Sequence, residues 1–401
     1  MQITEEEDNK YKAVMLKYGY TGMRDRLHGI INYWRSSKIR IAVAGESGAG
    51  KSTFINSIRG LRKGDPEYAT AGNKETTTTP TRYRLANRPN LEIWDLPGFG
   101  SRRFSDRKQY LHLVDFSRFD FILLLSSHRF THNDAWFAKE IVLMHPAQRL
   151  YFVRTQVDLD IIRLKNELSR TPTDSEIGIH LNDIKEDCSL QLKETVINNH
   201  DIFLINSYNR DEFDFNALVC KLIDTVDSIK HDAIVLSLKG ITKGALYHKL
   251  NTLKNRISDV SKVAGVAGAY TNRDGRPAPV EVDLMLKEAN YYREELGLEL
   301  EAIGVLANGL NVDTKRMLME LNMKTPCIVE SQKSFADFYK EYDKFRPGVF
   351  HSIPLLGGWL KSRAFQVQCA ITLKAFLDIC ALDVRYVHAY ISNELRKGKE
   401  V

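Results

Sequence analysis

The sequence has few of the features that mark secreted or membrane-spanning proteins. Its five cysteines show no Cys-x-x-Cys spacing, which favours isolated thiols in a reducing compartment over a disulfide framework or a zinc site. No uncharged apolar run reaches the roughly 18 residues needed to cross a bilayer. The first residues are acidic and polar, unlike those of a secretory signal. Gln2 stands where a myristoylation motif has glycine, and Lys399–Val401 does not match a prenylation motif. We therefore expect a cytoplasmic protein, with peripheral contact to intracellular or vacuolar membranes left open.

Neither sign of charge dominates the sequence. The 57 Lys and Arg residues against 51 Asp and Glu give a net charge of +6, a mild excess for 401 residues. That balance permits contact with phosphates or an anionic membrane surface, but it is too weak to predict nucleic-acid binding. At 43% hydrophobic residues the chain can bury a substantial core, and its length suggests two or three domains.

The pattern of apolar residues divides the chain into three parts. Between residues 38 and 230 short, nearly continuous apolar runs alternate with helical patterns, which predicts an α/β domain with a mostly parallel sheet. The runs are 39–44, 91–94, 119–125, 150–154 and 201–205. Residues 1–37 and 231–401 instead carry apolar stripes at helical spacing. We expect these two segments to form one all-α domain.

A phosphate-binding loop follows the first of these runs. The stretch GESGAGKS matches G-x-x-x-x-G-K-[ST] at every fixed position, with an apolar run before it and a helical pattern after it. Glycines let backbone N–H groups surround a β-phosphate, the lysine charge reaches the β/γ oxygens, and the serine hydroxyl ligates Mg²⁺. The candidate residues are Gly45, Glu46, Ser47, Gly48, Ala49, Gly50, Lys51, Ser52 and Thr53.

Two further segments favour a GTPase switch over an ATPase. Asp95 ends an apolar run, as an aspartate near Mg²⁺ must, and Gly98 three residues later can offer its N–H to a γ-phosphate. Upstream, the polar stretch 75–79 (ETTTT) stands where a threonine of a switch loop can bind Mg²⁺ and the γ-phosphate. A solvated threonine-rich loop explains most of these threonines equally well.

A base-reading segment is expected after a later apolar run. Residues 154–158 (RTQVD) fit [NT]-K-x-D from Thr155 to Asp158, except that Gln156 stands at the lysine position. An aspartate there accepts two hydrogen bonds from guanine that adenine cannot donate. Asn206 and Ser207, after the last run, could contribute a backbone contact to the guanine oxygen.

Four segments together resemble the immunity-related GTPases, an interferon-inducible family. They are GESGAGKSTFINSIRG, IWDLPGFGS, YFVRTQVDLDI and SSHRFTHNDAWFAKEI, and the similarity continues weakly through residues 291–307. The resemblance implies a Ras-like domain joined to one helical domain made from both chain ends. It also implies phosphate and Mg²⁺ roles for Lys51, Ser52, Thr77 and Asp95, a guanine-reading role for Asp158, and a role in hydrolysis for Glu75.

The residue after Gly98 departs from small signalling GTPases, which carry a water-orienting glutamine there. Phe99 can neither donate nor accept a hydrogen bond through its side chain, so we expect slow hydrolysis by the monomer. The resemblance implies self-assembly through the nucleotide face, with Arg129 as a candidate interface residue. Conformational change at residues 70–80 and 95–107 would couple the nucleotide to assembly. We therefore expect an Mg²⁺-dependent GTPase.

Alternative interpretations remain at this stage. Phe99 and Gln156 favour a pseudo-GTPase scaffold that binds nucleotide without turnover, and a P-loop ATPase would need adenine specificity despite Asp158. His128 and His132 have a metal-capable spacing, but surface or interface histidines are favoured. Residues 263–270 and 347–363 could contact a membrane, although burial inside the helical domain is the better explanation for most of their apolar side chains.

Overall fold

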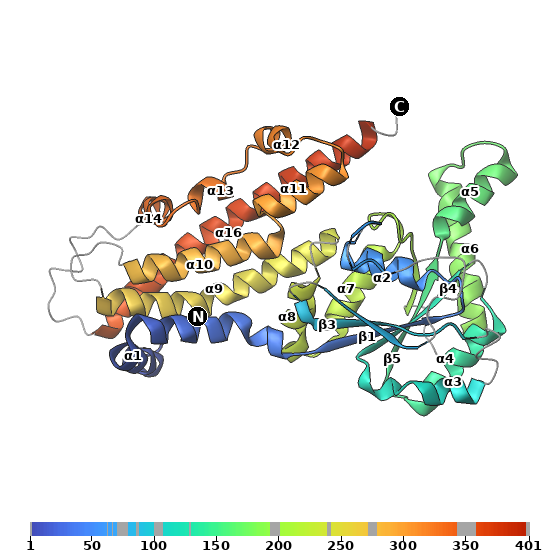
Figure 1. Cartoon of the computed structure of the whole chain (residues 1–401), viewed down its shortest axis with the longest axis horizontal. Coiled ribbons are helices and arrows are strands. Elements are labelled where there is room, and N and C mark those ends of the chain that lie inside the picture. The colour runs from blue at the N-terminus through green and yellow to red at the C-terminus, as the bar shows by residue number, and fades with distance from the viewer. Residues whose placement is uncertain are drawn as a thin grey trace. The chain divides into compact units, whose positions relative to one another are not determined.

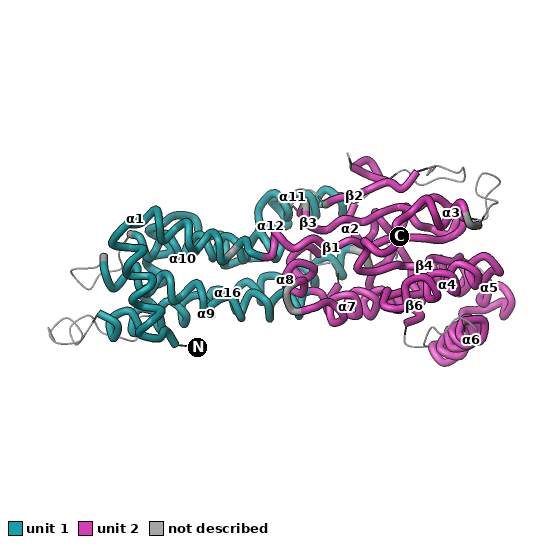
Figure 2. The backbone as a smooth tube through the Cα atoms, turned by 90° about the horizontal axis from the view of Figure 1, so that it is seen from below, with its two compact units in different colours: residues 1–33, 246–401 teal, residues 34–245 magenta. Residues whose placement is uncertain are grey.

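The computed structural model describes residues 2–61, 63–65, 67–69, 79–85, 88–99, 107–127, 130–192, 201–238, 242–271, 279–342 and 358–397. The chain forms two compact units, shown in different colours in Figure 2. One unit is Trp34–Ala245, and the other joins Met1–Tyr33 to Leu246–Val401. The α/β unit therefore extends beyond the expected limits of 38 and 230 at both ends.

The α/β unit is built on a six-stranded sheet in the order β2-β3-β1-β4-β5-β6. All neighbouring strands are parallel except β2 and β3, so the expected mostly parallel sheet is confirmed. The strand order reverses beside β1, which is where ligands bind in open α/β sheets. The strands are β1 (Ile39–Gly45), β2 (Thr81–Leu85), β3 (Arg88–Asp95), β4 (Phe121–Ser127), β5 (Arg149–Thr155) and β6 (Ile202–Leu204).

Helices cover both faces of this sheet (Figure 1). On one face alternate strand residues such as Ile122, Leu124 and Phe152 form a core with α3 (Arg107–Leu113), α4 (His132–Met144) and α6 (Asp174–Leu192). The other face is covered by α2 (Lys51–Arg59), α7 (Phe215–Thr225) and α8 (Ser228–Ser237), with the rings of Phe54 and Phe215 6.0 Å apart. Helix α5 (Val157–Leu168) follows β5 directly. Burial on both faces explains why β1, β4 and β5 read as continuous apolar runs.

The strand β2 was not among the predicted strands, because its sequence alternates with arginines and lacks an apolar run. Arg84 and Arg82 reach across to the buried Glu92 of β3, at 3.0 and 3.6 Å, and Arg40 of β1 lies 3.4 Å from the same carboxylate. Burial acts to raise the pKa of Glu92, but the hydrogen bond from Arg84 and the charge of Arg82 outweigh it and hold this pKa below its usual value. Charge pairing thus positions this edge strand.

The second unit is helical throughout its described part. The apolar stripes expected at helical spacing lie on α9 (Lys243–Thr271), α10 (Pro279–Leu296) and α16 (Gly358–Lys397). The remaining helices are α1 (Glu5–Asn32), α11 (Leu300–Gly309), α12 (Thr314–Leu321), α13 (Thr325–Ile328) and α14 (Gln332–Glu341). None of the helices in the described residues contains a stretch both long and apolar enough to cross a membrane.

Small residues of α9 allow α16 to pack very closely. This agrees with the expectation that most apolar side chains of residues 263–270 are buried inside the helical domain. Val263, Ala264, Val266 and Ala267 have no exposed surface. A Cβ added at Gly265 would lie 2.6 Å from the backbone nitrogen of Gln366, so any side chain there would force the helices apart. This stretch is a helix-packing surface.

Charged pairs are buried between α9 and α10. Lys249 donates to the carboxylate of Glu295 at 3.4 Å and to its carbonyl at 2.9 Å, and Arg256 lies 3.4 Å from Glu288. The two pairs lie seven residues, or two helical turns, apart on each helix. Burial raises the pKa of Glu288, and the charge of Arg256 offsets that effect only in part. These side chains have little or no exposed surface, so each charge depends on its partner.

Removing one member of the Arg256–Glu288 pair should destabilise the helical unit. We expect Arg256→Met to lower the free energy of unfolding by about 3–5 kcal/mol, because Glu288 would be left as a buried charge without its counter-ion. Adding Glu288→Leu should recover most of the loss. Urea unfolding at pH 7.5, followed by circular dichroism, measures both changes. As a control, Arg316→Met breaks an exposed pair with Glu320 and should cost less than about 1 kcal/mol. A single variant as stable as the wild type would contradict the proposed dependence.

Candidate nucleotide site

The phosphate-binding loop lies between the end of β1 and the start of α2, as predicted. Gly45, Gly48 and Gly50 adopt positive φ angles of 148°, 86° and 83°, which residues with a side chain rarely reach. A Cβ on Gly45 would lie 2.2 Å from the carbonyl oxygen of Leu125 on β4. Glycine is therefore required at this position both by backbone angle and by the closeness of the neighbouring strand.

Lys51, Ser52 and Asp95 meet at this loop. The Lys51 ammonium donates to the carbonyls of Gly45 and Glu46 at 3.0 and 2.9 Å, which holds it inside the curve of the loop. The Ser52 hydroxyl donates to the Asp95 carboxylate at 3.1 Å, and Asp95 is almost fully buried. A hydroxyl and a carboxylate oxygen are hard ligands that suit Mg²⁺, and a buried ammonium suits phosphate. The residues present fit the expected metal and nucleotide. Thr53 follows on the first turn of α2.

The loop after β3 is held against the phosphate-binding loop. A Cβ on Gly98 would lie 2.8 Å from the backbone nitrogen of Ser47, so only glycine allows this approach. Glu46 and Phe99 form a parallel backbone bridge beside it. The Gly98 position is thus suited to present backbone groups to a bound phosphate.

Phe99 points into the core of the unit. It is 1% exposed and stacks on Phe137 of α4, with ring centroids 5.0 Å apart and planes 13° apart. Tyr110 of α3 packs edge-on against it at 5.7 Å and donates a hydrogen bond to the Pro97 carbonyl. Phe99 therefore anchors the loop and offers no group to a water molecule.

The base-reading segment lies beside the phosphate loop. The Thr155 hydroxyl donates to the Ala49 carbonyl at 2.9 Å and lies 3.3 Å from that of Ser126. Gln156 adopts a left-handed conformation (φ 60°) before α5, and its amide lies 3.4 Å from the Gly48 carbonyl. Asp158 is half-buried in the first turn of α5. Thr155 and Gln156 therefore brace the phosphate loop, a role that the sequence motif alone did not reveal.

Asn206 and Ser207 lie next to that segment, because the Val157 amide donates to the Ile205 carbonyl at 3.4 Å. The Asn206 side chain is occupied within its own loop, accepting from the Tyr208 amide and donating to Glu212. The hydroxyl of Ser207 has no hydrogen-bond partner among the described residues. The side chain of Asn206 thus shapes this loop.

Sequence reasoning missed two residues of α4 that contact the site. Asn133 donates to the Glu46 carboxylate at 2.6 Å, and Asp134 accepts from the Ser126 hydroxyl at 2.9 Å. Burial raises the pKa of Asp134 to about 6. Thr131 and Asp134 form a capping box, a spacing that can be recognised in the sequence, whereas nothing there connects Asn133 to the phosphate loop.

Several predicted residues lie outside the described part of the chain. These are Glu75, Thr77, His128 and Arg129, together with most of the segments 70–80 and 95–107 expected to move. The described residues contain no cluster of three or more His, Cys, Asp or Glu side chains able to hold a metal ion.

One family of known proteins is similar to this chain over both the phosphate-binding loop and the helical unit. The model of the interferon-inducible GTPase (IIGP) family matches residues 22–389. The chain belongs to the interferon-inducible GTPase family. The expected relationship to the immunity-related GTPases is confirmed, and the match covers both units.

Relatives of the family are similar to this chain over most of its length. The T-cell-specific guanine nucleotide triphosphate-binding protein 2 of Mus musculus is 31% identical over 348 residues, covering 87% of this chain and 80% of the relative. Interferon-gamma-inducible GTPase 10 of Mus musculus is 32% identical, covering 75% and 70%. Interferon-inducible GTPase 5 of Rattus norvegicus is 33% identical, covering 70% and 59%.

Placing a glutamine at position 99 of this interferon-inducible GTPase should damage the fold without creating a water-orienting group. We expect Phe99→Gln to cost about 3 kcal/mol or more, because the aromatic contacts are lost and an amide is buried among rings. Thermal unfolding measures the loss, with Phe99→Leu as the apolar control. GTP turnover should not exceed that of Phe99→Leu. A stable Phe99→Gln variant with faster turnover would show that the side chain can reach the nucleotide.

Proposed function

We propose that this chain binds GTP together with Mg²⁺ and hydrolyses it to GDP and phosphate. The observation that carries the proposal is that Lys51, Ser52 and Asp95 meet at one glycine-rich loop, which is braced by Thr155. Lys51 would bind the β- and γ-phosphates, and Ser52 and Asp95 would hold Mg²⁺, with Thr77 completing the metal site. The metal ion would neutralise charge on the phosphates.

Guanine specificity is proposed for Asp158. Its carboxylate lies in the first turn of α5, directly after the segment that contacts the phosphate loop. In that position it can accept two hydrogen bonds from the N–H groups of guanine, while adenine would leave it unpaired. Gln156 lacks the charge and the long stem of a lysine, so contact with the face of the base is reduced.

Slow turnover by the isolated molecule follows from the burial of Phe99. In hydrolysis a water attacks the γ-phosphorus and the bond to the bridging oxygen of GDP breaks, so a group must orient that water. Phe99 cannot orient it, and we propose that Glu75 does so when a second copy binds through the nucleotide face and Arg129. Excluding water at such an interface would also strengthen the electrostatic contacts to the phosphates.

A role in cell-autonomous defence at membranes is proposed on the basis of the family alone. We propose a cytoplasmic protein that contacts intracellular or vacuolar membranes peripherally, through the helical unit. Of the stretch 347–363 that could contact a membrane, the structure describes residues 358–363. The indole N–H of Trp359 donates to the Ile3 carbonyl at 3.2 Å. That hydrogen bond favours a packing role for Trp359 itself.

Burial of Phe99 also keeps a second candidate open, a pseudo-GTPase scaffold that binds nucleotide without turnover. The two functions differ in one measurable property, the release of phosphate. The presence of residues suited to bind phosphate and metal is compatible with both functions.

GTP turnover measured at several protein concentrations separates the two functions. We expect activity per molecule to rise with concentration, to need Mg²⁺, and to fall about 100-fold or more in Lys51→Ala, because the charge at the β- and γ-phosphates is lost. ATP should be a poor substrate. The matched control Lys165→Ala alters an exposed lysine of α5 and should behave as the wild type. Activity that is flat across a wide concentration range would exclude activation by assembly, and binding without turnover would support the scaffold.

Asp158→Asn tests the base-reading role separately. The variant should weaken GTP binding about 100-fold, because hydrogen bonds to a charged acceptor are lost, and should improve binding of xanthosine triphosphate. Competition titration with a fluorescent nucleotide measures both affinities. Asp174→Asn, at an exposed position that begins α6, is the control. An unchanged preference for GTP would place the base site elsewhere.

A further inference from the structure

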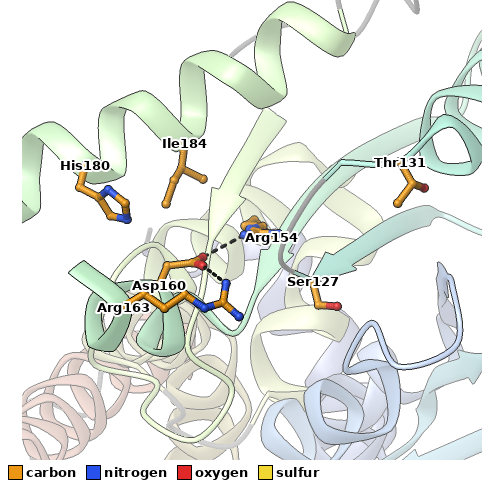
Figure 3. Close-up of a pocket in the computed structure, with 7 residues that line it drawn as sticks. All are labelled: Ser127, Thr131, Arg154, Asp160, Arg163, His180 and Ile184. Carbon is orange, nitrogen blue, oxygen red and sulfur yellow. Dashed lines mark hydrogen bonds and ion pairs between the residues drawn. The ribbon is translucent and has the colours of Figure 1, made fainter. Parts of the chain in front are cut away.

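A separate pocket of about 580 Å³ opens beside the carboxyl end of β5 (Figure 3). Its walls come from the end of β4 (Ser127), the N-cap of α4 (Thr131), β5 (Arg154), α5 (Asp160 and Arg163) and α6 (His180). Ile184 adds an apolar side. The side chains of five different elements thus line one space.

The pocket does not belong to the phosphate-binding loop. Side chains alternate along a strand, so Arg154 shares its face of the sheet with Phe152, in the core formed with α4 and α6. The next residue, Thr155, points the other way and bonds to Ala49 of the loop. One strand therefore serves two sites on opposite sides of the sheet.

Among the described side chains that line the pocket, two are positively charged and one is negatively charged. Arg154 and Arg163 bind different oxygens of the carboxylate of Asp160, at 2.9 and 3.2 Å (Figure 3). Arg154 is 3% exposed, and an arginine cannot lose its proton to relieve that imbalance.

The pocket also contains buried hydrogen-bond donors without an acceptor among the described residues. Nε and Nη1 of Arg154 have no acceptor in the part of the chain that the structure describes, and Nε2 of His180 also has no partner there. Leaving such a donor unsatisfied in a buried place is unfavourable, and more so for a charged group. An acceptor with negative charge would satisfy these donors.

We propose that this pocket is a second oxyanion site that binds a phosphate group. Donors and hydroxyls approach from strands β4 and β5 and from helices α4, α5 and α6, which suits the tetrahedral oxygens of phosphate better than the two coplanar oxygens of a carboxylate. A single water occupies about 30 Å³ of liquid, so the pocket has room for a phosphate that carries a substituent. Free phosphate and a phosphate monoester share this chemistry.

Calorimetric titration of the full-length chain with inorganic phosphate and with glycerol 3-phosphate tests the site. Lys51→Ala serves as the background, because it removes the lysine charge of the phosphate-binding loop, and chloride keeps the ionic strength constant. We expect phosphate binding to persist in that background. Adding Arg163→Gln should weaken it about 10-fold or more, since a charge-assisted hydrogen bond is lost. His180→Ala should weaken it as well.

The matched control is Arg170→Gln, an exposed arginine outside the pocket that pairs with Glu176. It should leave the phosphate affinity unchanged, and circular dichroism checks that every variant is folded. Binding of both anions identifies a monoester ligand, and binding of inorganic phosphate alone identifies free phosphate.

Three outcomes would overturn the proposal. The first is phosphate binding that disappears with Lys51→Ala, and the second is binding that persists unchanged in both Arg163→Gln and His180→Ala. The third is the absence of any phosphate binding. GTP binding by the wild type, measured in the same series, reports on the proposed GTPase function separately, so either idea can fail without the other.

Discussion

The nucleotide site depends on how tightly the phosphate-binding loop is held against the ends of β4 and β5. The Thr155 hydroxyl bonds to the Ala49 carbonyl, and Gly45 lies so close to Leu125 that no side chain would fit. These contacts join three strands at one point, so a shift of any strand would move Lys51 and the base-reading segment together. The phosphate-binding and base-reading motifs, whose contacting residues Ala49 and Thr155 are 106 positions apart in the sequence, thus form one structural unit.

Apolar patterning predicted most of the fold but not its charged parts. Continuous runs located β1, β4 and β5 because both faces of those strands are buried. Helical stripes located α9, α10 and α16 because one face of each helix is buried. By contrast, β2 is held by arginines around Glu92, and Lys249 and Glu295 are buried as a pair. In a sequence these charges look like solvent-exposed positions. Only the three-dimensional arrangement shows that each is the other's counter-ion.

The candidate site was predictable where a motif specifies backbone geometry. The glycines, Lys51, Ser52 and Asp95 fall where the motif requires, because a loop that surrounds phosphate admits few other residues. Contacts that depend on distant elements could not be predicted. Asn133 reaches Glu46 from α4, and the Thr155 hydroxyl contacts the phosphate-binding loop. The roles of Glu75 and Thr77 stay predictions, since both lie outside the described residues.

Phenylalanine at position 99 gives up the ability to orient water and instead fixes the position of its own backbone. A glutamine on a mobile loop can orient water, but it contributes little to the position of its own backbone. Phe99, stacked on Phe137 and packed against Tyr110, fixes the backbone that places Gly98 against Ser47. Residues 96–99 can therefore present backbone N–H groups to a γ-phosphate in a defined position, yet none of their side chains can orient the attacking water. Under the proposed function, such a protein would detect GTP alone and would need a group from another segment to hydrolyse it quickly.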